Sequence, residues 1–432
     1  MKLFGTMENV NGMLHIGGVP ADFAVRKYGT PLIIYDETLL RDTCRTFRDG
    51  FRSDAFETVV TYASKAFSCK AVVRVAEEEG LSLDVVSYGE MYTAKAAGFP
   101  MHKVYLHGNN KSDDELRAAL AWGVGTIIVD GMAEAKRLAR LTVDDIRGID
   151  VILRVNPGID AHTHEYIRTA TSDSKFGMAV GAPETAATLR FLHEAPGIRL
   201  RGIHCHIGSQ IFEEDSFLKA VEVMTDYLVD IRTQTGIALD VLNLGGGFGV
   251  YYTDTDRPFA LKPFLTRLAK HIRDCAAARD ITLSRAIIEP GRAVVCNAGT
   301  TLYRVGDTKY LSAAALHYLF IDGGMADNPR PALYQAQYEA CLANRMNEVA
   351  EKTWRVGGKC CESGDILIPA VKMPDVRTGD ILAVGSTGAY TYSMSGHYNR
   401  LPKPAVIFVR DGRDRPVIRR ETPDDLIQYD MD

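Results

Sequence analysis

The sequence lacks several features that would place it in a special class of protein. Of its 432 residues, 24% are charged and the formal net charge is −5, so no basic excess indicates nucleic acid or a membrane surface. No window approaches the length of a membrane span, and the first 13 residues lack an apolar run of signal length. We therefore expect a soluble, cytoplasmic, globular protein that is large enough for two domains.

The spacing of cysteine and histidine residues in the sequence indicates neither a metal site nor a disulfide scaffold. The eight cysteines show neither paired metal-ligand spacing nor the density of a disulfide framework, so we expect reduced thiols. Cys360 and Cys361 are the only adjacent pair. Two histidine pairs occur, at 162 with 164 and at 204 with 206, and we expect neither pair to ligate one metal ion. We assign no metal site.

Between residues 57 and 290, short β-branched or aromatic runs alternate with longer amphipathic segments. Alternation of this kind requires a parallel sheet, and eight units over roughly 240 residues favour a closed (β/α)8 barrel over an open doubly wound sheet, which is the alternative. The predicted strands are 57–63, 81–87, 103–107, 125–130, 150–156, 198–207, 240–244 and 283–290, and the predicted helices include 113–122, 133–141, 216–233 and 261–278.

After residue 293 the pattern changes to short apolar runs interrupted by Gly, Pro and Asp, with one helical window at 331–345. This spacing predicts a mainly antiparallel β domain. Residues 1–35, with two β-like runs around a helix at 20–28, are expected to join it. The predicted fold is thus α/β, with a barrel over 36–293 inserted into a β domain formed by 1–35 and 294–432.

Lys65 occupies a position that suits amine chemistry. Residues 58–62 predict a buried strand, and Ser68 as N-cap predicts a helix over 69–79 that ends at Gly80. A lysine between a strand end and a helix start, partly desolvated, has its charged form disfavoured, as an amine that condenses with a carbonyl requires. A solvated loop lysine is the alternative.

Other polar residues also follow the predicted strands. Catalysis in such barrels takes place at the C-terminal ends of the strands, so these side chains should face one opening. They are Lys65, Asp84, Ser87, Glu90, 107–111, Asp130, Arg154, Asn156, His206, Ser209, 245–249, Glu289 and Arg292.

Three of these positions suggest specific partners. The run 244–249, LGGGFG, could expose backbone amides to a phosphate, although a tight turn needs no ligand. Glu289 and Arg292 could bind a pyridinium nitrogen and an anion, or could form a salt bridge with each other. His206 could lie flat on an aromatic ring, or could be a hydrogen-bonded core histidine.

Six motifs occur in order along the chain: YASKA, HCHIGSQ, LNLGGGFG, IEPGR, CESGD and GAYTYSMSGHYN. Together they resemble the pyridoxal-phosphate decarboxylases of the ornithine/diaminopimelate/arginine class, which have an alanine-racemase-like barrel. The segments 107–116, 155–167, 173–178 and 330–334 are similar to the diaminopimelate branch in particular. The resemblance implies a (β/α)8 barrel with a β domain, paired as a homodimer with shared active sites.

The resemblance also implies a pyridoxal 5'-phosphate site. Lys65 would bind the cofactor covalently, His206 would stack on its ring, and Glu289 would keep the ring nitrogen protonated. The remaining cofactor contacts would come from Ser209, Gly246, Gly247, Pro290, Gly291, Arg292 and Tyr390.

For the substrate, the resemblance implies an anion site formed by Arg292, Arg330 and Tyr334, with Tyr390 beside it. Cys361 would come from the partner subunit as the proton donor, and Glu362 would contact the distal amino group. Cys360 has no assigned role.

The expected reaction is decarboxylation of meso-2,6-diaminopimelate to L-lysine and CO2, the last step of lysine biosynthesis. Decarboxylation of another basic amino acid (ornithine, lysine or arginine), racemisation, and non-catalytic carriage of pyridoxal phosphate are the alternatives. A basic monocarboxylate offers no distal anion for the two arginines, and carriers resemble the barrel alone.

Overall fold

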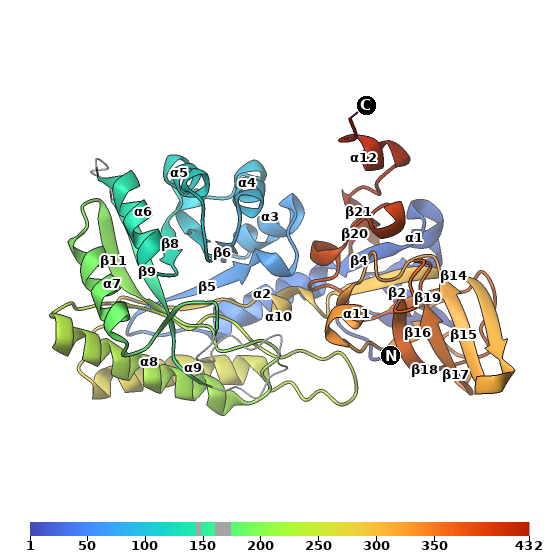
Figure 1. Ribbon diagram of the computed structural model, residues 1–432. Helices are drawn as coiled ribbons and strands as arrows, with labels where there is room; N and C mark the ends of the chain where they lie inside the picture. The colour runs from blue at the N-terminus through green and yellow to red at the C-terminus, as the bar shows by residue number, and fades with distance from the viewer. Residues whose placement is uncertain (144–147, 160–173, 432) are drawn as a thin grey trace. The chain divides into compact units, whose positions relative to one another are not determined.

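The protein is described by a computed structural model, in which residues 1–143, 148–159 and 174–431 are placed well enough to describe. The chain divides into two compact units (Figure 1). The barrel unit contains residues 44–249 and 258–291, and the β unit contains residues 1–43, 250–257 and those from 292 onward. Among the described helices, none is long and apolar enough to cross a membrane.

Eight parallel strands form the barrel unit, in the order β9, β11, β12, β13, β5, β6, β7, β8, and β8 pairs with β9 to close the ring. Each predicted strand segment overlaps one of them, so the predicted barrel is confirmed and the open sheet is excluded. The strands are β5 Glu57–Ala63, β6 Ser82–Val85, β7 Val104–Leu106, β8 Thr126–Val129, β9 Ile149–Asn156, β11 Ile198–His204, β12 Val241–Asn243 and β13 Arg285–Ile288, with the short β10 Met178–Ala179 added to β9.

Amphipathic helices cover the outside of the strands, and Figure 1 shows α3 to α6 next to one another. Their apolar faces are buried, as Val72 and Val75 in α3 illustrate. The helices are α3 Lys70–Glu78, α4 Tyr88–Ala97, α5 Asp113–Trp122, α6 Met132–Thr142, α7 Pro183–Glu194, α8 Glu214–Thr235 and α9 Leu261–Ala278; α2 Glu37–Gly50 begins in the β unit and ends in the barrel unit.

The predicted start of α3 is wrong by one residue. Cys69, and not Ser68, is the N-cap residue, and no side chain caps the helix. The hydroxyl of Ser68 is buried and has no hydrogen-bond partner among the described residues. The reason is local, because Phe67 and Cys69 are both extended and delay the helix. Lys65 lies before them in a one-turn 3-10 helix, Ser64–Ala66.

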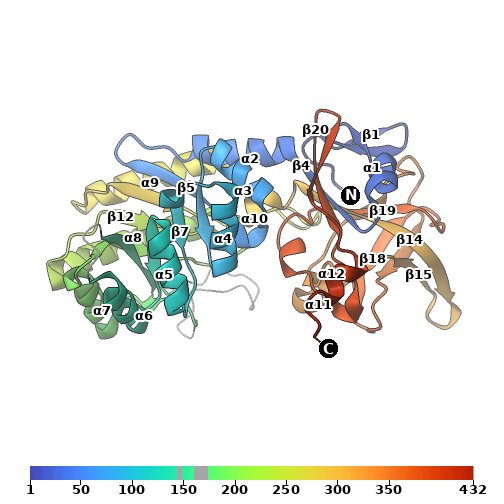
Figure 2. The same ribbon diagram turned by 90° about the horizontal axis from the view of Figure 1, so that it is seen from above.

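The β unit contains a nine-stranded sheet in the order β18, β17, β15, β14, β4, β20, β21, with β19 pairing β14 and β16. Most pairs are antiparallel, as predicted, but β15 with β17 and β4 with β20 are parallel. Strands β4 and β20 lie side by side in Figure 2. The strands are β4 Leu32–Asp36, β14 Gly299–Leu311, β15 Leu316–Ile321, β16 Ala340–Leu342, β17 Lys352–Gly357, β18 Ile366–Met373, β19 Ile381–Val384, β20 Ala405–Arg410 and β21 Arg413–Ile418.

A smaller sheet lies near the N-terminus of the β unit. It pairs β1 Glu8–Val10, β2 Met13–Ile16 and β3 Val19–Pro20, and α1 Ala21–Tyr28 follows it. Short helices complete the unit: α10 Arg292–Val295, α11 Arg330–Tyr334 and α12 Pro423–Ile427.

The long helix predicted over 331–345 is wrong. Helix α11 has only five residues and ends at Tyr334, because the next residue, Gln335, adopts a left-handed conformation with φ of 53°. Residues 340–342 then form β16, which pairs with β19. Tertiary pairing thus overrides a helical pattern in this segment.

Candidate active site

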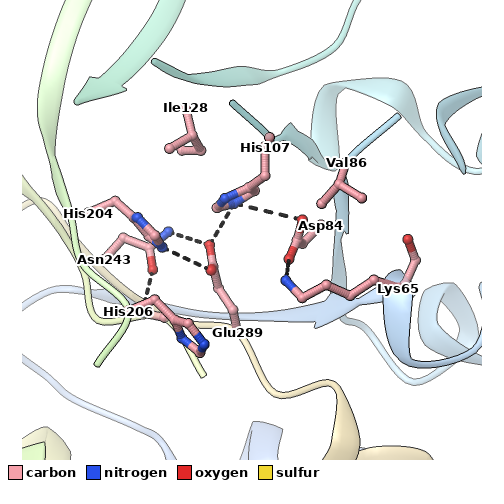
Figure 3. Close-up of polar contacts among 12 residues, drawn as sticks. Lys65, Asp84, Val86, His107, Ile128, His204, His206, Asn243 and Glu289 are labelled. Atoms are coloured by element: carbon pink, nitrogen blue, oxygen red, sulfur yellow. Dashed lines mark hydrogen bonds and ion pairs between the residues drawn. The ribbon is translucent and has the colours of Figure 1, made fainter. Parts of the chain in front are cut away.

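Polar side chains from six barrel strands meet at the C-terminal ends of those strands (Figure 3). Below them the interior is packed with apolar residues, which include Tyr105, Ile128, Ile152, Val241 and Ile287. Apolar packing holds the strands together, so the polar groups above it are fixed in place. The residues concerned are Lys65, Asp84, His107, His204, Asn243 and Glu289.

Lys65 stands at the accessible edge of this group. Its side chain is 41% exposed, and Nζ donates a hydrogen bond to Asp84 Oδ2 at 3.2 Å. Asp84 is fully buried in β6. Its second oxygen, Oδ1, has no hydrogen-bond partner among the described residues and lies 3.9 Å from His107 Nε2. The amine is therefore oriented by a carboxylate and is still open to a reactant.

Glu289 is buried and contacts three polar side chains, which come from β12, β11 and the end of β7. Asn243 Nδ2 donates to Oε1 at 2.6 Å, and His204 Nε2 donates to Oε2 at 3.1 Å. His107 Nε2 lies 2.8 Å from Oε1. A carboxylate offers about four acceptor positions, so Oε2 can accept another donor.

The ionisation of this cluster follows from its contacts. Burial disfavours the charged carboxylate, but the electrostatic attraction and hydrogen bonding of His107 and His204 outweigh burial and hold the pKa of Glu289 well below its usual range. Burial lowers the pKa of His204 to about 4, and Glu289 only partly opposes this. We conclude that Glu289 is an anion at neutral pH and that His204 is neutral.

A metal ion is not needed to explain the group. Ligand atoms of His107, His204 and Glu289 lie within 4.8 Å of one another, close enough to hold an ion. However, both oxygens of Glu289 already accept hydrogen bonds from protein side chains. These contacts explain the burial of the carboxylate.

His204 and His206 have different partners. Side chains two residues apart within a strand share a face. These two separate because β11 ends at His204, and His206 follows in the loop. His206 Nδ1 accepts a hydrogen bond from the Gly246 backbone N–H at 3.2 Å. Burial and the nearby charge of Lys65 hold the pKa of His206 well below its usual range, so its imidazole is neutral.

The glycine turn after β12 packs too closely for side chains. A Cβ atom on Gly246 would lie 2.3 Å from the carbonyl oxygen of Glu289, and one on Gly247 would lie 2.6 Å from that of Gly208. Gly247 also has a φ of 111°. The turn after β13 is equally tight, because a Cβ on Gly291 would lie 2.9 Å from Ala63 Cβ. Pro290 accepts a hydrogen bond from the Ala63 N–H.

In the β unit, the structure brings Arg292 and Arg330 together through a tyrosine that sequence reasoning missed. Arg292 Nη1 donates to the Tyr252 hydroxyl at 2.6 Å, and Arg330 Nη1 donates to the same oxygen at 3.0 Å. Tyr338 accepts a further hydrogen bond from Arg330 at 2.7 Å. Tyr390, in a left-handed conformation, places its ring 4.8 Å from the Arg292 guanidinium carbon.

The remaining predicted residues lie in loops or at helix ends. Tyr334 is half-buried at the end of α11, and Ser209 is half-buried after β11. Cys361 and Glu362 are exposed in the loop between β17 and β18. Asn399 Oδ1 accepts a hydrogen bond from the Cys361 N–H at 2.7 Å, which fixes the backbone of that loop. His162 and His164 lie outside the described residues.

Comparison with known proteins identifies the family. Residues 38–296 match the family model of the pyridoxal-dependent decarboxylases, pyridoxal binding domain. The chain is 47% identical over 432 residues to diaminopimelate decarboxylase of Bacillus subtilis (strain 168), covering 100% of this chain and 98% of the relative. The chain belongs to the diaminopimelate decarboxylase family of pyridoxal-dependent decarboxylases.

Solved structures agree with this assignment. The crystal structure of diaminopimelate decarboxylase from M. jannaschii in complex with L-lysine aligns with a TM-score of 0.91 at 28% identity, covering 99% of this chain and 98% of that one. The Helicobacter pylori enzyme, also with L-lysine, aligns with a TM-score of 0.84 at 26% identity over 94% of this chain and 98% of that one. The predicted family, its dependence on pyridoxal phosphate and its decarboxylase activity are confirmed.

A second lysine near the strand ends of this decarboxylase, Lys111, is buried and inaccessible to solvent. Lys111 Nζ donates to Glu134 Oε1 at 2.7 Å and to two backbone carbonyls at 2.6 Å, with 2% of its side chain exposed. Burial lowers the pKa of Lys111, and the charge of Glu134 opposes that shift. The pair anchors the loop that follows His107.

Replacing one partner of this pair should destabilise the barrel unit. Glu134→Ala leaves a buried ammonium without its carboxylate, which typically costs about 3–5 kcal/mol. The double variant Lys111→Met with Glu134→Leu should recover much of the loss, because it removes both charges. Urea unfolding would measure both effects. A single variant as stable as the wild type would contradict the pairing.

The buried neutral state of His204 can be tested by titration. In the unfolded chain histidine binds a proton near pH 6.5, whereas folded His204 does so only near pH 4. Folding stability contributed by the neutral His204 is therefore lost as pH falls through this window. We expect an imidazole C2–H resonance with a midpoint near 4 that disappears in His204→Gln, which keeps a donor for Glu289. If the resonance that His204→Gln removes has a midpoint near pH 6.5 instead, His204 is not held neutral by burial.

Proposed function

We propose that this enzyme decarboxylates meso-2,6-diaminopimelate to L-lysine and CO2. The observation that supports this substrate most directly is the arginine pair in the β unit. Arg330 is buried, with 7% of its surface exposed, and no carboxylate lies within ion-pair distance of it among the described residues. A buried guanidinium without a counter-ion is unfavourable, so the site favours a ligand that supplies an anion.

The residues at the strand ends suit pyridoxal phosphate. Its aldehyde needs an accessible amine, its ring nitrogen needs a carboxylate, and its ring needs a neutral flat surface; Lys65, Glu289 and His206 have these properties. When bound, the cofactor supplies an electron sink that lets the carboxyl group leave as CO2.

We propose the following roles for the chain's own groups at this site. Lys65 would hold the cofactor covalently, and Glu289 Oε2 would accept a hydrogen bond from its ring N–H. Ser209 would lie near the cofactor, and Tyr390 would contact its phosphate. The close-packed turns of Gly246, Gly247, Pro290 and Gly291, with Arg292, would surround that phosphate, because no side chains intervene there.

Substrate recognition would rest on the β unit. Arg292, Arg330 and Tyr334 would bind the carboxylate remote from the reacting carbon. Ornithine, lysine and arginine each have a single carboxylate, which is the group to be lost, so they would leave the arginine pair without an anion. A racemase or a cofactor carrier would not need to distinguish amino acids with a distal carboxylate from those without one.

Two further residues would come from the partner subunit of a homodimer. Cys361 Sγ would supply the proton that replaces the departing carboxyl group, and Glu362 would pair with the distal amino group. Their exposure in a single chain supports this proposal.

We also propose roles for the two parts of the chain. Residues 36–293 would bind the cofactor, and residues 1–35 and 294–432 would supply substrate and dimer contacts. The enzyme would work in the cytoplasm, where its eight thiols stay reduced.

A direct assay tests the substrate. The purified protein, supplied with pyridoxal phosphate, should release CO2 from meso-diaminopimelate and form L-lysine. Ornithine, lysine and arginine serve as comparison substrates. Faster CO2 release from any of these three would reject the proposed specificity, and racemisation without CO2 would reject the reaction.

Lys65 should be the residue that carries the cofactor. Borohydride reduction of the wild-type protein should fix pyridoxyl label on the peptide that contains Lys65, because this amine is accessible at the strand ends. Mass spectrometry of the digested protein measures it. Lys65→Ala should lose the label, whereas the exposed control Lys175→Ala should keep it. Label on Lys111 or Lys175 would show that the assignment is wrong.

A shared active site predicts recovery of activity in mixed dimers. Lys65→Ala and Cys361→Ala should each be nearly inactive, but after subunit exchange one mixed dimer contains one intact site. About half of the dimers are mixed, so roughly a quarter of wild-type CO2 release should return. If exchange is demonstrated by mass spectrometry and the mixture stays inactive, both residues serve the same subunit's site.

A further inference from the structure

Two tyrosines connect the arginines of the anion site. The Tyr252 hydroxyl accepts hydrogen bonds from both Arg292 and Arg330, at 2.6 and 3.0 Å, and the Tyr338 hydroxyl accepts one from Arg330 at 2.7 Å. The rings of Tyr252 and Tyr338 meet edge to face, with centroids 5.6 Å apart. Tyr252 is 8% exposed and Tyr338 is 4% exposed, so the cluster is shielded from water.

The tyrosines orient the arginines without neutralising them. A carboxylate in the place of Tyr252 would cancel the positive charge that attracts an anion. A phenol accepts hydrogen bonds while it stays neutral, and burial raises the pKa of Tyr252 well above its usual range. The arginine pair therefore keeps its charge in a fixed geometry.

The chain holds Tyr252 in place from both sides. Asp256 Oδ2 accepts hydrogen bonds from the backbone N–H groups of Tyr252 and Thr253, at 2.8 and 2.9 Å. The carbonyl of Tyr251 accepts hydrogen bonds from Asn297 Nδ2 at 2.7 Å and from Ser386 Oγ at 3.0 Å. A residue fixed in this way can fix its own partners.

We propose that Tyr252, assisted by Tyr338, is a positioning residue that clamps Arg292 and Arg330 into one site for the distal carboxylate and so sets the preference for a dicarboxylate substrate. The proposal rests on the function proposed above and names the residue that determines its specificity. It assigns Tyr252 no contact with the reacting carbon.

Substitution of Tyr252 should separate binding from chemistry. Tyr252→Phe removes the oxygen that joins the two guanidiniums, and hydrogen bonds to charged groups are strong enough that KM for meso-diaminopimelate should rise about tenfold or more. The kcat should change little, because the reacting carbon is untouched. Tyr338→Phe removes one hydrogen bond and should have a smaller effect.

The neighbouring tyrosine provides a matched control. The Tyr251 hydroxyl donates to Glu339 Oε1 at 2.8 Å and contacts neither arginine, so Tyr251→Phe should keep the wild-type KM. Melting temperatures of all three variants establish whether they fold. If Tyr252→Phe does not fold, Tyr338→Phe decides the question with the same measurements.

Binding of two unreactive ligands tests the clamp independently of turnover. L-lysine keeps the distal carboxylate after decarboxylation, whereas cadaverine lacks it. Calorimetry on the holoenzyme should show that Tyr252→Phe weakens L-lysine about tenfold and leaves cadaverine unchanged. Equal weakening of both ligands, or none of either, would overturn the proposal. A wild-type protein inactive on meso-diaminopimelate would reject the proposed function, but selective loss of L-lysine binding would still support the clamp.

Discussion

The burial of the Glu289 carboxylate is the constraint on which the barrel site depends. An ionised carboxylate removed from water is costly unless polar groups surround it. Asn243 at the end of β12 and His204 at the end of β11 donate to it, and His107 after β7 approaches it. Each group can reach Glu289 only if its strand ends at the same height along the barrel as the others. The strand register therefore brings the polar groups to the carboxylate, and their contacts with it in turn stabilise that register.

In the β unit the buried charge is positive, and the guanidinium groups of Arg292 and Arg330 must stay available to bind an anion. An acidic partner would stabilise Arg330 but would also occupy its charge. The neutral hydroxyls of Tyr252 and Tyr338 accept hydrogen bonds from Arg330, and Tyr252 also accepts one from Arg292, without cancelling positive charge. The same chain therefore uses donors to maintain an anion in one unit and neutral acceptors to maintain cations in the other.

The sequence predicts the barrel well because its signals are local and repeated. Each strand segment has an apolar run of its own, and Lys65, Glu289 and the glycine turn lie where strands end. The partners of these residues are harder to predict. His204 and Asn243 are the last residues of apolar strands, and their spacing in the sequence does not indicate that both contact Glu289. Tyr252 lies three residues after Gly249, the last residue of the glycine-rich run, yet its contacts come from residues 40 and 78 positions away. The helix over 331–345 fails for the same reason, because pairing with a distant strand decides residues 340–342.

The two lysines near the strand ends show why position alone does not identify a reactive amine. Lys65 and Lys111 both follow barrel strands, and each contacts a buried carboxylate. Lys111 also donates to two carbonyls and has 2% of its side chain exposed, so its three N–H groups are used and no reactant can approach it. The Lys65 side chain is 41% exposed and is oriented by Asp84. An amine must be both oriented and accessible to attack a carbonyl, and in the described part of the barrel unit the contacts distinguish these two lysines where the sequence pattern does not.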